Sequence, residues 1–342
     1  MAKRQQQRQR QQQPKRLWSL GAIAFVSLTI LVGLKLGQSH LGVLATAHRQ
    51  SNRQVFSQTQ HQAQDTTSLQ VAQQIHHQFN RQGIRYETLT LPKSIVHVVR
   101  ISAQAPVVIR PAIATEGLEK LEVLAQQAGA IAAINGGFFD PNNQLTTSYV
   151  TIDGDVALDP RENSGLMENF NVAIYIERIL NRSEFRRYQC NTANGQEVNY
   201  AIALHDQLTP FSCELIDALG AGPALLPQFR GEEEAFVDAI NGRDALGSNT
   251  PNARSAIGLT PDGTIIFAMA AQRADVSDRT GLSLFELADV MKSLGAEQAL
   301  NLDGGSSSSL YYDGTTHYGR LDADNNVIKR SVKSVLLVVP RE

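Results

Sequence analysis

The sequence contains little cysteine, and the two cysteines that it has form no recognisable motif. Cys190 and Cys213 are too few for the disulfide framework of a small secreted domain, and their spacing is not that of a zinc or redox site. Those classes of protein are therefore excluded. The sequence is compatible with one disulfide or with two free thiols, because pairing depends on whether the domain faces an oxidising compartment.

Acidic residues are absent from the first 64 residues, which contain nine Lys and Arg. Residues 65–342 contain 22 Lys and Arg against 33 Asp and Glu, so this part has a net charge of −11 although the whole chain has only −2. An acidic domain repels the phosphate backbone of DNA and RNA. We therefore expect no nucleic-acid partner.

Charge of either sign is absent from residues 17–34, an apolar run of eighteen residues. A helix of this length crosses most of a hydrocarbon core of roughly 30 Å. Six basic residues precede the run, which by the positive-inside bias keeps the N-terminus in the cytoplasm. We predict a disordered basic cytoplasmic tail at 1–16, a single-pass transmembrane anchor at 17–36, and the remainder of the chain on the extracytoplasmic side. A small-x-small sequence at 45–47 leaves a cleaved signal peptide as the alternative.

Residues 37–83 are rich in Gln, His and Ser. Apolar residues with weak helical spacing occur only near the end of this segment, at Leu69, Val71, Ile75 and Phe79. Such a composition cannot bury enough apolar surface to form a core of its own. We therefore predict a stalk, containing at most one helix, which holds a domain at 84–342 away from the membrane.

The domain combines two helix patterns with many short strand patterns. Residues 116–128 and 284–294 have amphipathic helical spacing, and Ser283 and Glu286 fit a capping box at the start of the second helix. Each helix is followed by a wholly apolar segment, 130–135 and 298–302, of the kind found in buried central strands.

Alternating and β-branched residues predict the remaining strands. They lie at 86–91, 94–102, 106–114, 148–153, 156–158, 171–177, 198–204, 308–312 and 334–339, with a hairpin at 253–270 around a Pro-Asp-Gly turn. No repeat of 20–50 residues occurs, which argues against a solenoid or propeller. We expect an α+β fold, with a mixed, strand-rich sheet core, a few packed helices and one preceding transmembrane helix.

Two segments of the domain resemble each other. Asn135-Gly136-Gly137 and Asp303-Gly304-Gly305 each follow a predicted apolar strand, and Ser306 and Ser307 extend the second. Paired glycines permit positive φ and close approach of a ligand. Successive free N–H groups in such a turn can form an anion-binding nest. The sequence therefore predicts a pocket for an anion at the two turns, with Asn135 and Asp303 at its mouth.

Four motifs in order carry a resemblance to a known family: INGGFFD at 134–140, GAGPALL at 220–226, ARSAIGLTPDG at 253–263 and LNLDGGSSSSL at 300–310. With them, the domain from about residue 110 to residue 340 resembles the phosphodiester glycosidase domain family. The resemblance implies a hydrolase that cleaves a sugar-1-phosphodiester. The chain departs from the commoner family pattern at 146–149 and through insertions at 159–200, which leaves the substrate unspecified.

The chemistry that the resemblance implies suggests a role for each candidate residue. Arg254 would bind the phosphate bidentately, Asp303 would stabilise positive charge on the sugar or activate water, and Asn135 would contact the substrate or a metal ion. The substrate-binding candidates are Gly136, Gly137, Gly222, Gly304, Gly305, Ser306 and Ser307. The sequence identifies no cofactor with certainty. The oxygen donors of Asn135, Asp140 and Asp303 would suit Ca²⁺.

The resemblance implies that the partner is a glycan or sugar phosphate. We expect it to be part of a cell-envelope polysaccharide or glycolipid. Two other functions fit the same sequence. A non-catalytic envelope module could bind anionic glycans or assist polysaccharide export, and a hydrolase of ordinary glycosides would need a pair of carboxylates. A serine nucleophile is not favoured, because the sequence contains no G-x-S-x-G.

Overall fold

The computed structural model describes residues 75–81 and 83–341. The predicted tail, the predicted anchor and most of the predicted stalk lie outside this range. Among the residues described, none of the helices is both long enough and apolar enough to span a bilayer.

The first strand, β1 (Ile75–Arg81), pairs with β2 (Ile84–Leu91), so the sheet begins within the segment predicted as a stalk. Ile75 and Phe79 thus belong to a strand rather than to a helix.

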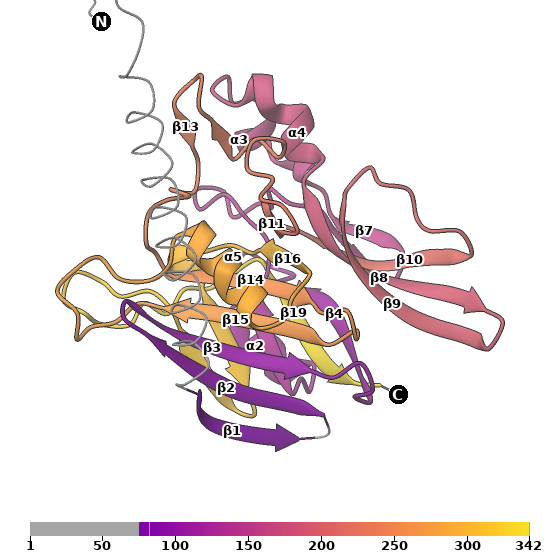
Figure 1. Ribbon diagram of the computed structural model, residues 1–342. Coiled ribbons are helices and arrows are strands. Elements are labelled where there is room, and N and C mark those ends of the chain that lie inside the picture. Colours follow the sequence, from indigo (N-terminus) through magenta and orange to yellow (C-terminus); the bar gives the residue numbers. More distant parts are fainter. Residues whose placement is uncertain (1–74, 82, 342) are drawn as a thin grey trace, which may run out of the picture. The chain divides into compact units, whose positions relative to one another are not determined.

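Two antiparallel sheets form the centre of the domain (Figure 1). The larger has the order β1-β2-β3-β15-β14-β16-β11, and its further strands are β3 (Ser94–Ile101), β15 (Ile265–Ala271), β14 (Arg254–Leu259), β16 (Gln298–Asn301) and β11 (Ala224–Leu226). The smaller comprises, in order, β18 (Thr315–Tyr318), β17 (Ser309–Tyr312), β5 (Ala132–Asn135), β19 (Ser334–Pro340) and β4 (Val107–Ile113).

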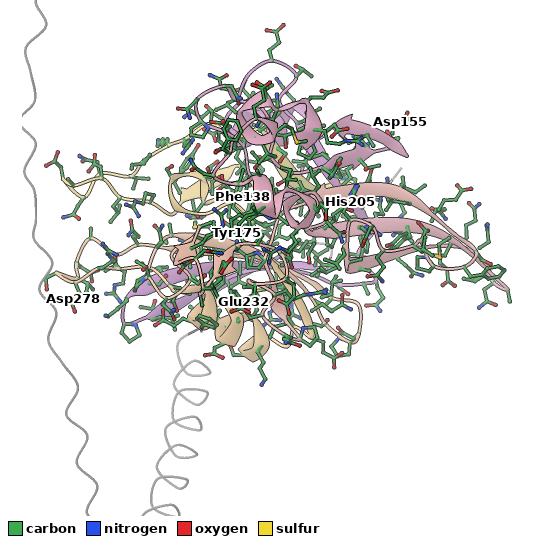
Figure 2. All side chains as sticks on the ribbon, turned by 90° about the horizontal axis from the view of Figure 1, so that it is seen from above. Phe138, Asp155, Tyr175, His205, Glu232 and Asp278 are labelled. Carbon is green, nitrogen blue, oxygen red and sulfur yellow. A yellow bond between two sulfur atoms is a disulfide. The ribbon has the colours of Figure 1, made fainter. Side chains whose placement is uncertain are left out.

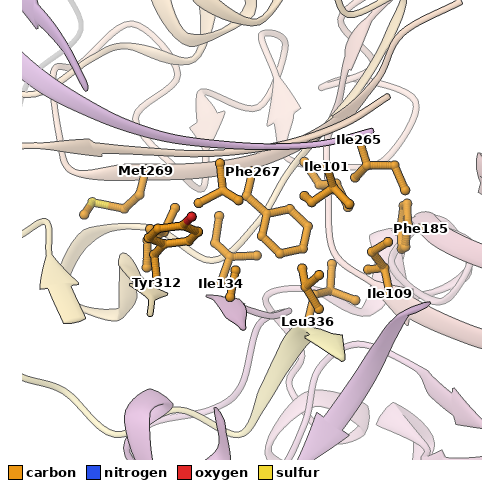
Figure 3. Close-up of a cluster of buried hydrophobic side chains, with 14 of the residues drawn as sticks. Ile101, Ile109, Ile134, Phe185, Ile265, Phe267, Met269, Tyr312 and Leu336 are labelled. Atoms are coloured by element: carbon orange, nitrogen blue, oxygen red, sulfur yellow. The ribbon is translucent and has the colours of Figure 1, made fainter. Parts of the chain in front are cut away.

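The main apolar core lies between these two sheets (Figure 3). Ile101 and Phe267 from the larger sheet meet Ile134 and Leu336 from the smaller one, and all four are almost completely buried. Successive residues of a strand point to opposite faces. Every second residue of each central strand therefore faces this core, and the residues between them face outward.

Two helices cover the outward faces. Helix α5 (Leu284–Ser293) packs Leu287 and Met291 against the larger sheet, and α2 (Leu121–Gln127) packs Leu124 against the smaller one. The domain is therefore layered as helix, sheet, sheet and helix. The predicted capping box of α5 is confirmed, since Ser283 Oγ accepts from Glu286 N and Glu286 Oε2 accepts from Ser283 N.

The prediction of a strand-rich α+β domain with few helices is confirmed, but each strand pair that the structure describes is antiparallel. The expectation of a mixed sheet was therefore wrong. Wholly apolar strands, such as those predicted at 130–135 and 298–302, are typical of parallel sheets, because both faces of a parallel sheet are buried. In this domain the core buries one face of these antiparallel strands and a helix buries the other.

A third antiparallel sheet projects from the sandwich and has the order β7-β6-β10-β8-β9. Its strands are β6 (Val150–Ile152), β7 (Asp155–Leu158), β8 (Ser183–Thr192), β9 (Gly195–Leu204) and β10 (Cys213–Gly220). Cys190 and Cys213 face each other on β8 and β10 and form a disulfide, with Cα atoms 3.9 Å apart. The sequence had left this pairing open.

Short helices and a small hairpin connect the strands of this region. They are the 3₁₀ helices at Pro160–Glu162 and Ala173–Tyr175, α3 (Ser164–Met167), α4 (Ile176–Leu180), and the pair β12 (Val237–Asp238) and β13 (Arg243–Asp244). The predicted strand at 171–177 was wrong. Val172, Tyr175 and Ile179 pack together at helical spacing of three and four residues, and this contact overrides the local alternation.

Four stacked aromatic side chains join the two central sheets at one edge. Tyr86 Oη lies 2.7 Å from His97 Nδ1 and 3.1 Å from His317 Nε2, and the two imidazole centroids are 4.1 Å apart. Tyr86 also stacks on Tyr312. Burial lowers the pKa of His97 to about 3, helped by the neighbouring His317, and burial also lowers the pKa of His317.

These histidines predict acid sensitivity of the fold. Below a pH of about 6.5 the unfolded chain binds protons that the folded chain excludes, so the free energy of unfolding falls by up to about 1.4 kcal/mol per pH unit for each histidine. Urea unfolding of the domain between pH 8 and pH 5 measures the slope. His97→Gln should reduce it, with the value at pH 8 as the reference. An equally steep loss in the variant would contradict a neutral buried His97.

Candidate active site

The four sequence motifs meet at one end of the sandwich. Asp303 N donates to Gly136 O at 3.0 Å, which joins the two diglycine turns directly. Gly305 N donates to Ala253 O at 2.8 Å and brings in the third motif. Asn301 and Gly222 exchange two hydrogen bonds, Gly222 N to Asn301 O and Asn301 Nδ2 to Gly222 O, and these bring in the fourth. Motifs far apart in the sequence thus form a single junction.

Asn135 lies at the centre of this junction and is completely buried. Its Nδ2 donates to Asp303 O at 2.7 Å, and its Oδ1 accepts from Ser255 Oγ at 2.7 Å and from Ser309 N at 3.1 Å. The amide therefore ties β5 to β17 of its own sheet, to β14 of the other sheet and to the turn that follows β16. The expectation that Asn135 contacts a substrate or a cation is corrected, because its oxygen already accepts two hydrogen bonds.

The diglycine N–H groups do not form an open nest. Gly136 N and Gly137 N donate to the carbonyl and hydroxyl oxygens of Ser334, while Gly304 N donates to Asp303 Oδ1 and Gly305 N to Ala253 O. All four donors are therefore used within the chain. The predicted anion pocket of free backbone amides has to be given up, although the two turns do lie side by side.

Glycine is required at these turns mainly because other backbone approaches too closely. A β-carbon on Gly136 would overlap Ser334, and one on Gly137 would overlap the carbonyl oxygen of Gly220. At Gly222 two constraints act. Its φ of +114° lies in a region that other residues rarely adopt, and a β-carbon there would overlap Glu234 and Phe236. The glycines thus allow neighbouring segments of the chain to pack closely, and this packing accounts for Gly222, which the sequence had suggested as a substrate-binding residue.

Asp303 is the carboxylic acid at the junction. Burial raises its pKa to about 6, and the Ser307 hydroxyl, the charge of Arg330 and the Gly304 N–H oppose that rise. The side chain nevertheless belongs to a residue that is only half-buried. A carboxyl group with a pKa near neutrality is suited to proton transfer.

Arg330 is the cation beside this acid. Its Nη1 donates to Ser306 Oγ at 2.9 Å, and its guanidinium lies over the Phe139 ring, 4.9 Å from the centroid. Arg330 is half-buried. Sequence reasoning missed it because no motif surrounds it; its only signal is a pair of basic residues, Lys329 and Arg330, in an acidic domain.

Arg254 lies next to the site but has other partners. Its Nε donates to Leu282 O, and its Nη2 donates to the carbonyl oxygens of Leu246, Gly247 and Thr250, at 2.9–3.2 Å. Burial lowers its pKa to about 10, so it stays charged at neutral pH. Its Nη1 is directed toward Gly304. The fork predicted to hold a phosphate is therefore largely occupied in holding the 246–250 loop.

A buried acid supports the loop that contains Gly222. Glu234 accepts from Ser183 Oγ at 2.7 Å and from Ala224 N at 2.9 Å, and burial raises its pKa. Next to it, the Phe236 ring packs on Phe138, with centroids 5.5 Å apart. Phe138 directly follows the first diglycine turn. Figure 2 views the domain from above with Phe138, Tyr175 and His205 labelled near its middle.

A second buried charged cluster lies in the third sheet. Glu184 Oε2 pairs with Arg186 Nε at 2.9 Å, and Glu184 Oε1 contacts His205 Nδ1. The side chains of Glu184 and Arg186 are each only 2% exposed. His205 also stacks on Tyr149, with centroids 3.8 Å apart. The Glu184 and Tyr149 contacts of His205 and the Tyr86 contacts of His317 are those of structural residues.

No three His, Cys, Asp or Glu side chains in the described part of the chain converge as ligands of a metal ion. Of the oxygens considered for Ca²⁺, Asn135 Oδ1 is engaged as described above. Asp140 Oδ1 accepts from Asn142 N at 2.8 Å within its own turn. The geometry gives no reason to assign a cation to these residues.

Comparison with known proteins agrees with the motifs. Residues 128–339, more than half of the chain, match the model of a family described as phosphodiester glycosidase. No curated protein matches the chain.

Two solved structures have a similar fold. A hypothetical protein from Synechocystis is 21% identical with a TM-score of 0.53, and the match covers 78% of this chain but 64% of that protein. The zebrafish N-acetylglucosamine-1-phosphodiester alpha-N-acetylglucosaminidase catalytic domain, auto-inhibited by its pro-peptide, is 17% identical with a TM-score of 0.51, over 78% of this chain and 82% of that one.

The Asn135 contacts predict that this residue is needed for folding. Asn135→Leu leaves the Ser255 hydroxyl, the Ser309 N–H and the Asp303 carbonyl without their partner, and we expect the free energy of unfolding to fall by about 3 kcal/mol. Asn194→Ala, at an exposed turn position, should change it by less than about 0.5 kcal/mol. Chemical denaturation compares the two, and equal stabilities would argue against a central role for the buried amide.

Proposed function

Because the chain belongs to the phosphodiester glycosidase family, we propose that it hydrolyses a sugar-1-phosphodiester on the extracytoplasmic side of a membrane. The natural substrate in this proposal is a cell-envelope glycan or glycolipid. The observation that carries the proposal is the grouping of Asp303, Ser306 and Arg330 where the four motifs meet. One acid with a raised pKa and one half-buried arginine supply the two functions that such a reaction needs.

In the proposed reaction, water attacks the anomeric carbon and the bond between that carbon and the bridging oxygen breaks. The products are the free sugar and a phosphomonoester, which leaves with the bond electrons. A phosphate leaving group is a weak base and needs little protonation, so the demand falls on the attacking water. Asp303 in its carboxylate form accepts the proton of that water and stabilises positive charge on the sugar ring.

Arg330 and Ser306 bind the phosphate in this proposal. A half-buried guanidinium forms strong charge-assisted hydrogen bonds to phosphate oxygens, and the Ser306 hydroxyl that it already contacts is an additional donor. The contact of Arg330 with Phe139 limits the orientations of its side chain. Arg254 then has a supporting function, since it fixes the 246–250 loop beside Gly304.

Two features support the extracytoplasmic location. The apolar run at 17–34 follows six basic residues, and Cys190 and Cys213 lie in disulfide geometry. Disulfides persist in oxidising compartments outside the cytosol. A membrane anchor at 17–36 would hold the domain beside envelope substrates, and detection of the intact N-terminus in the membrane fraction would separate an anchor from a cleaved signal peptide.

Asp303→Asn should abolish turnover while the protein remains folded. In the wild type, the rate should rise with pH through an apparent pKa of about 6 and then level off, because the carboxylate is the active form. Release of free N-acetylglucosamine from its methyl 1-phosphodiester measures both. Turnover by Asp303→Asn at the wild-type rate would exclude Asp303 as the catalytic carboxylate. If the wild-type protein binds sugar phosphates but releases no sugar, the non-catalytic glycan-binding module is favoured.

The two arginines can be separated by matched substitutions. Arg330→Gln removes a charge-assisted contact to phosphate, so KM should rise at least about tenfold with little change in unfolding. Arg254→Gln removes bonds to four backbone carbonyls and should mainly lower the unfolding temperature. Initial rates and thermal unfolding of both variants test this. The opposite pattern would indicate that Arg254, and not Arg330, binds the phosphate.

A further inference from the structure

Three buried side-chain polar atoms in the described part of the chain have no hydrogen-bond partner. They are Asn301 Oδ1, Ser307 Oγ and Ser308 Oγ, and all three belong to the segment that contains Asp303. Nearly every buried polar group in a folded protein is hydrogen-bonded, because an unpaired one has lost its bonds to water without replacement. Unpaired groups so close to a candidate acid therefore need a functional explanation.

Ser307 is the one of these residues whose hydroxyl lies beside the Asp303 carboxyl group. It is only 1% exposed and ends the 3₁₀ turn Gly305–Ser307. Within this turn Ser307 N donates to Gly304 O at 3.2 Å, which brings Ser307 back toward Asp303. The hydroxyl lies close enough to lower the pKa of Asp303, although it forms no hydrogen bond of ordinary geometry. Catalytic hydrogen bonds are often long in a free enzyme and shorten when the substrate binds.

The side chain of Asp303 is held from one side only. Both main-chain groups of Asp303 are fixed, since its N–H donates to Gly136 O and its carbonyl oxygen accepts from Asn135 Nδ2. Of the carboxyl oxygens, Oδ1 accepts from Gly304 N at 2.9 Å. A base that must face an attacking water needs a fixed orientation, and one hydrogen bond leaves the carboxylate plane free to rotate. A second donor would fix that plane, and Ser307 lies where it can supply one.

We propose that Ser307 is a positioning residue, whose hydroxyl donates to the Asp303 carboxylate and holds it toward the attacking water. This inference rests on the proposed function. The preceding residue has a different role, because Ser306 Oγ accepts from Arg330 and belongs to the phosphate-binding group. Two adjacent serines thus divide the work of the turn. Ser306 binds the substrate, and Ser307 orients the base.

The unpaired state of Ser307 makes this role distinguishable from a structural one. Removal of a serine that is hydrogen-bonded in the free protein lowers stability, because its partner is left unsatisfied. Removal of a buried hydroxyl that has no partner leaves no group unsatisfied and relieves its own desolvation. Ser307→Ala should therefore remain as stable as the wild type or become more stable, although its activity falls. Such an opposition between stability and activity is typical of functional residues.

The test is the pH dependence of hydrolysis of the methyl 1-phosphodiester of N-acetylglucosamine. In Ser307→Ala the apparent pKa of the rising limb should increase by about one unit, because the hydroxyl no longer stabilises the carboxylate. On the plateau kcat should fall about tenfold at an unchanged KM, since the base is less well oriented. The variant retains Arg330, which acts on the Asp303 charge, and Arg254, which points toward Gly304. The shift can therefore be assigned to the hydroxyl.

Ser308→Ala is the matched control. It removes an equally buried and equally unpaired hydroxyl from the next residue, whose side chain lies against Gly319. Its pH profile and kcat should remain those of the wild type. Ser306→Ala should differ from both, because loss of a phosphate donor mainly raises KM. Urea unfolding of the three variants reports their stability.

Each outcome separates the inference from the function on which it rests. A wild-type pH profile and kcat in Ser307→Ala would overturn the inference and leave the hydrolase intact. An equal shift in Ser308→Ala would also overturn it, since the effect would then come from the segment and not from the contact with Asp303. A lower urea midpoint together with lost activity in Ser307→Ala would make Ser307 a structural residue. If the wild-type protein does not hydrolyse the ester, the proposed function fails and the inference fails with it.

Discussion

The structure depends on one buried side-chain amide. Asn135 has no exposed surface and connects the end of β5 to Asp303, Ser255 and Ser309, which belong to segments far apart in the sequence. Because an unpaired polar group in a dry interior is strongly unfavourable, the two sheets can close over this amide only in the register that satisfies it. The position of the candidate acid is therefore a consequence of how the sandwich closes.

Close backbone packing is the second constraint, and it explains the glycines better than ligand binding does. Gly136, Gly137 and Gly222 each lie where a β-carbon would overlap a neighbouring segment of the chain. A motif rich in glycine can thus indicate contact between segments of the protein rather than contact with a ligand. In this domain these contacts support the polar side chains of the candidate site, Asp303, Ser306 and Arg330.

Much of the fold could be predicted because its signals are local. The capping box at Ser283 and the apolar strands beside Asn135 and Asp303 can be identified from neighbouring residues alone. Strand β8 could not, because its buried pair Glu184 and Arg186 looks like an exposed surface until the partner carbonyls are known. The candidate site could be predicted only in part. The motifs point to Asp303, whereas the occupied donors of Arg254 and the position of Arg330 depend on contacts between distant segments.

The placement of the last strand has a consequence for how the chain matures. Strand β19 (Ser334–Pro340) lies in the middle of the smaller sheet, between β4 and β5, which come from the beginning of the domain. Until that strand has been synthesised, β4 and β5 lack the neighbour that joins them, and the smaller sheet cannot be completed. Closure of the core over this sheet is therefore a late event in the folding of the domain.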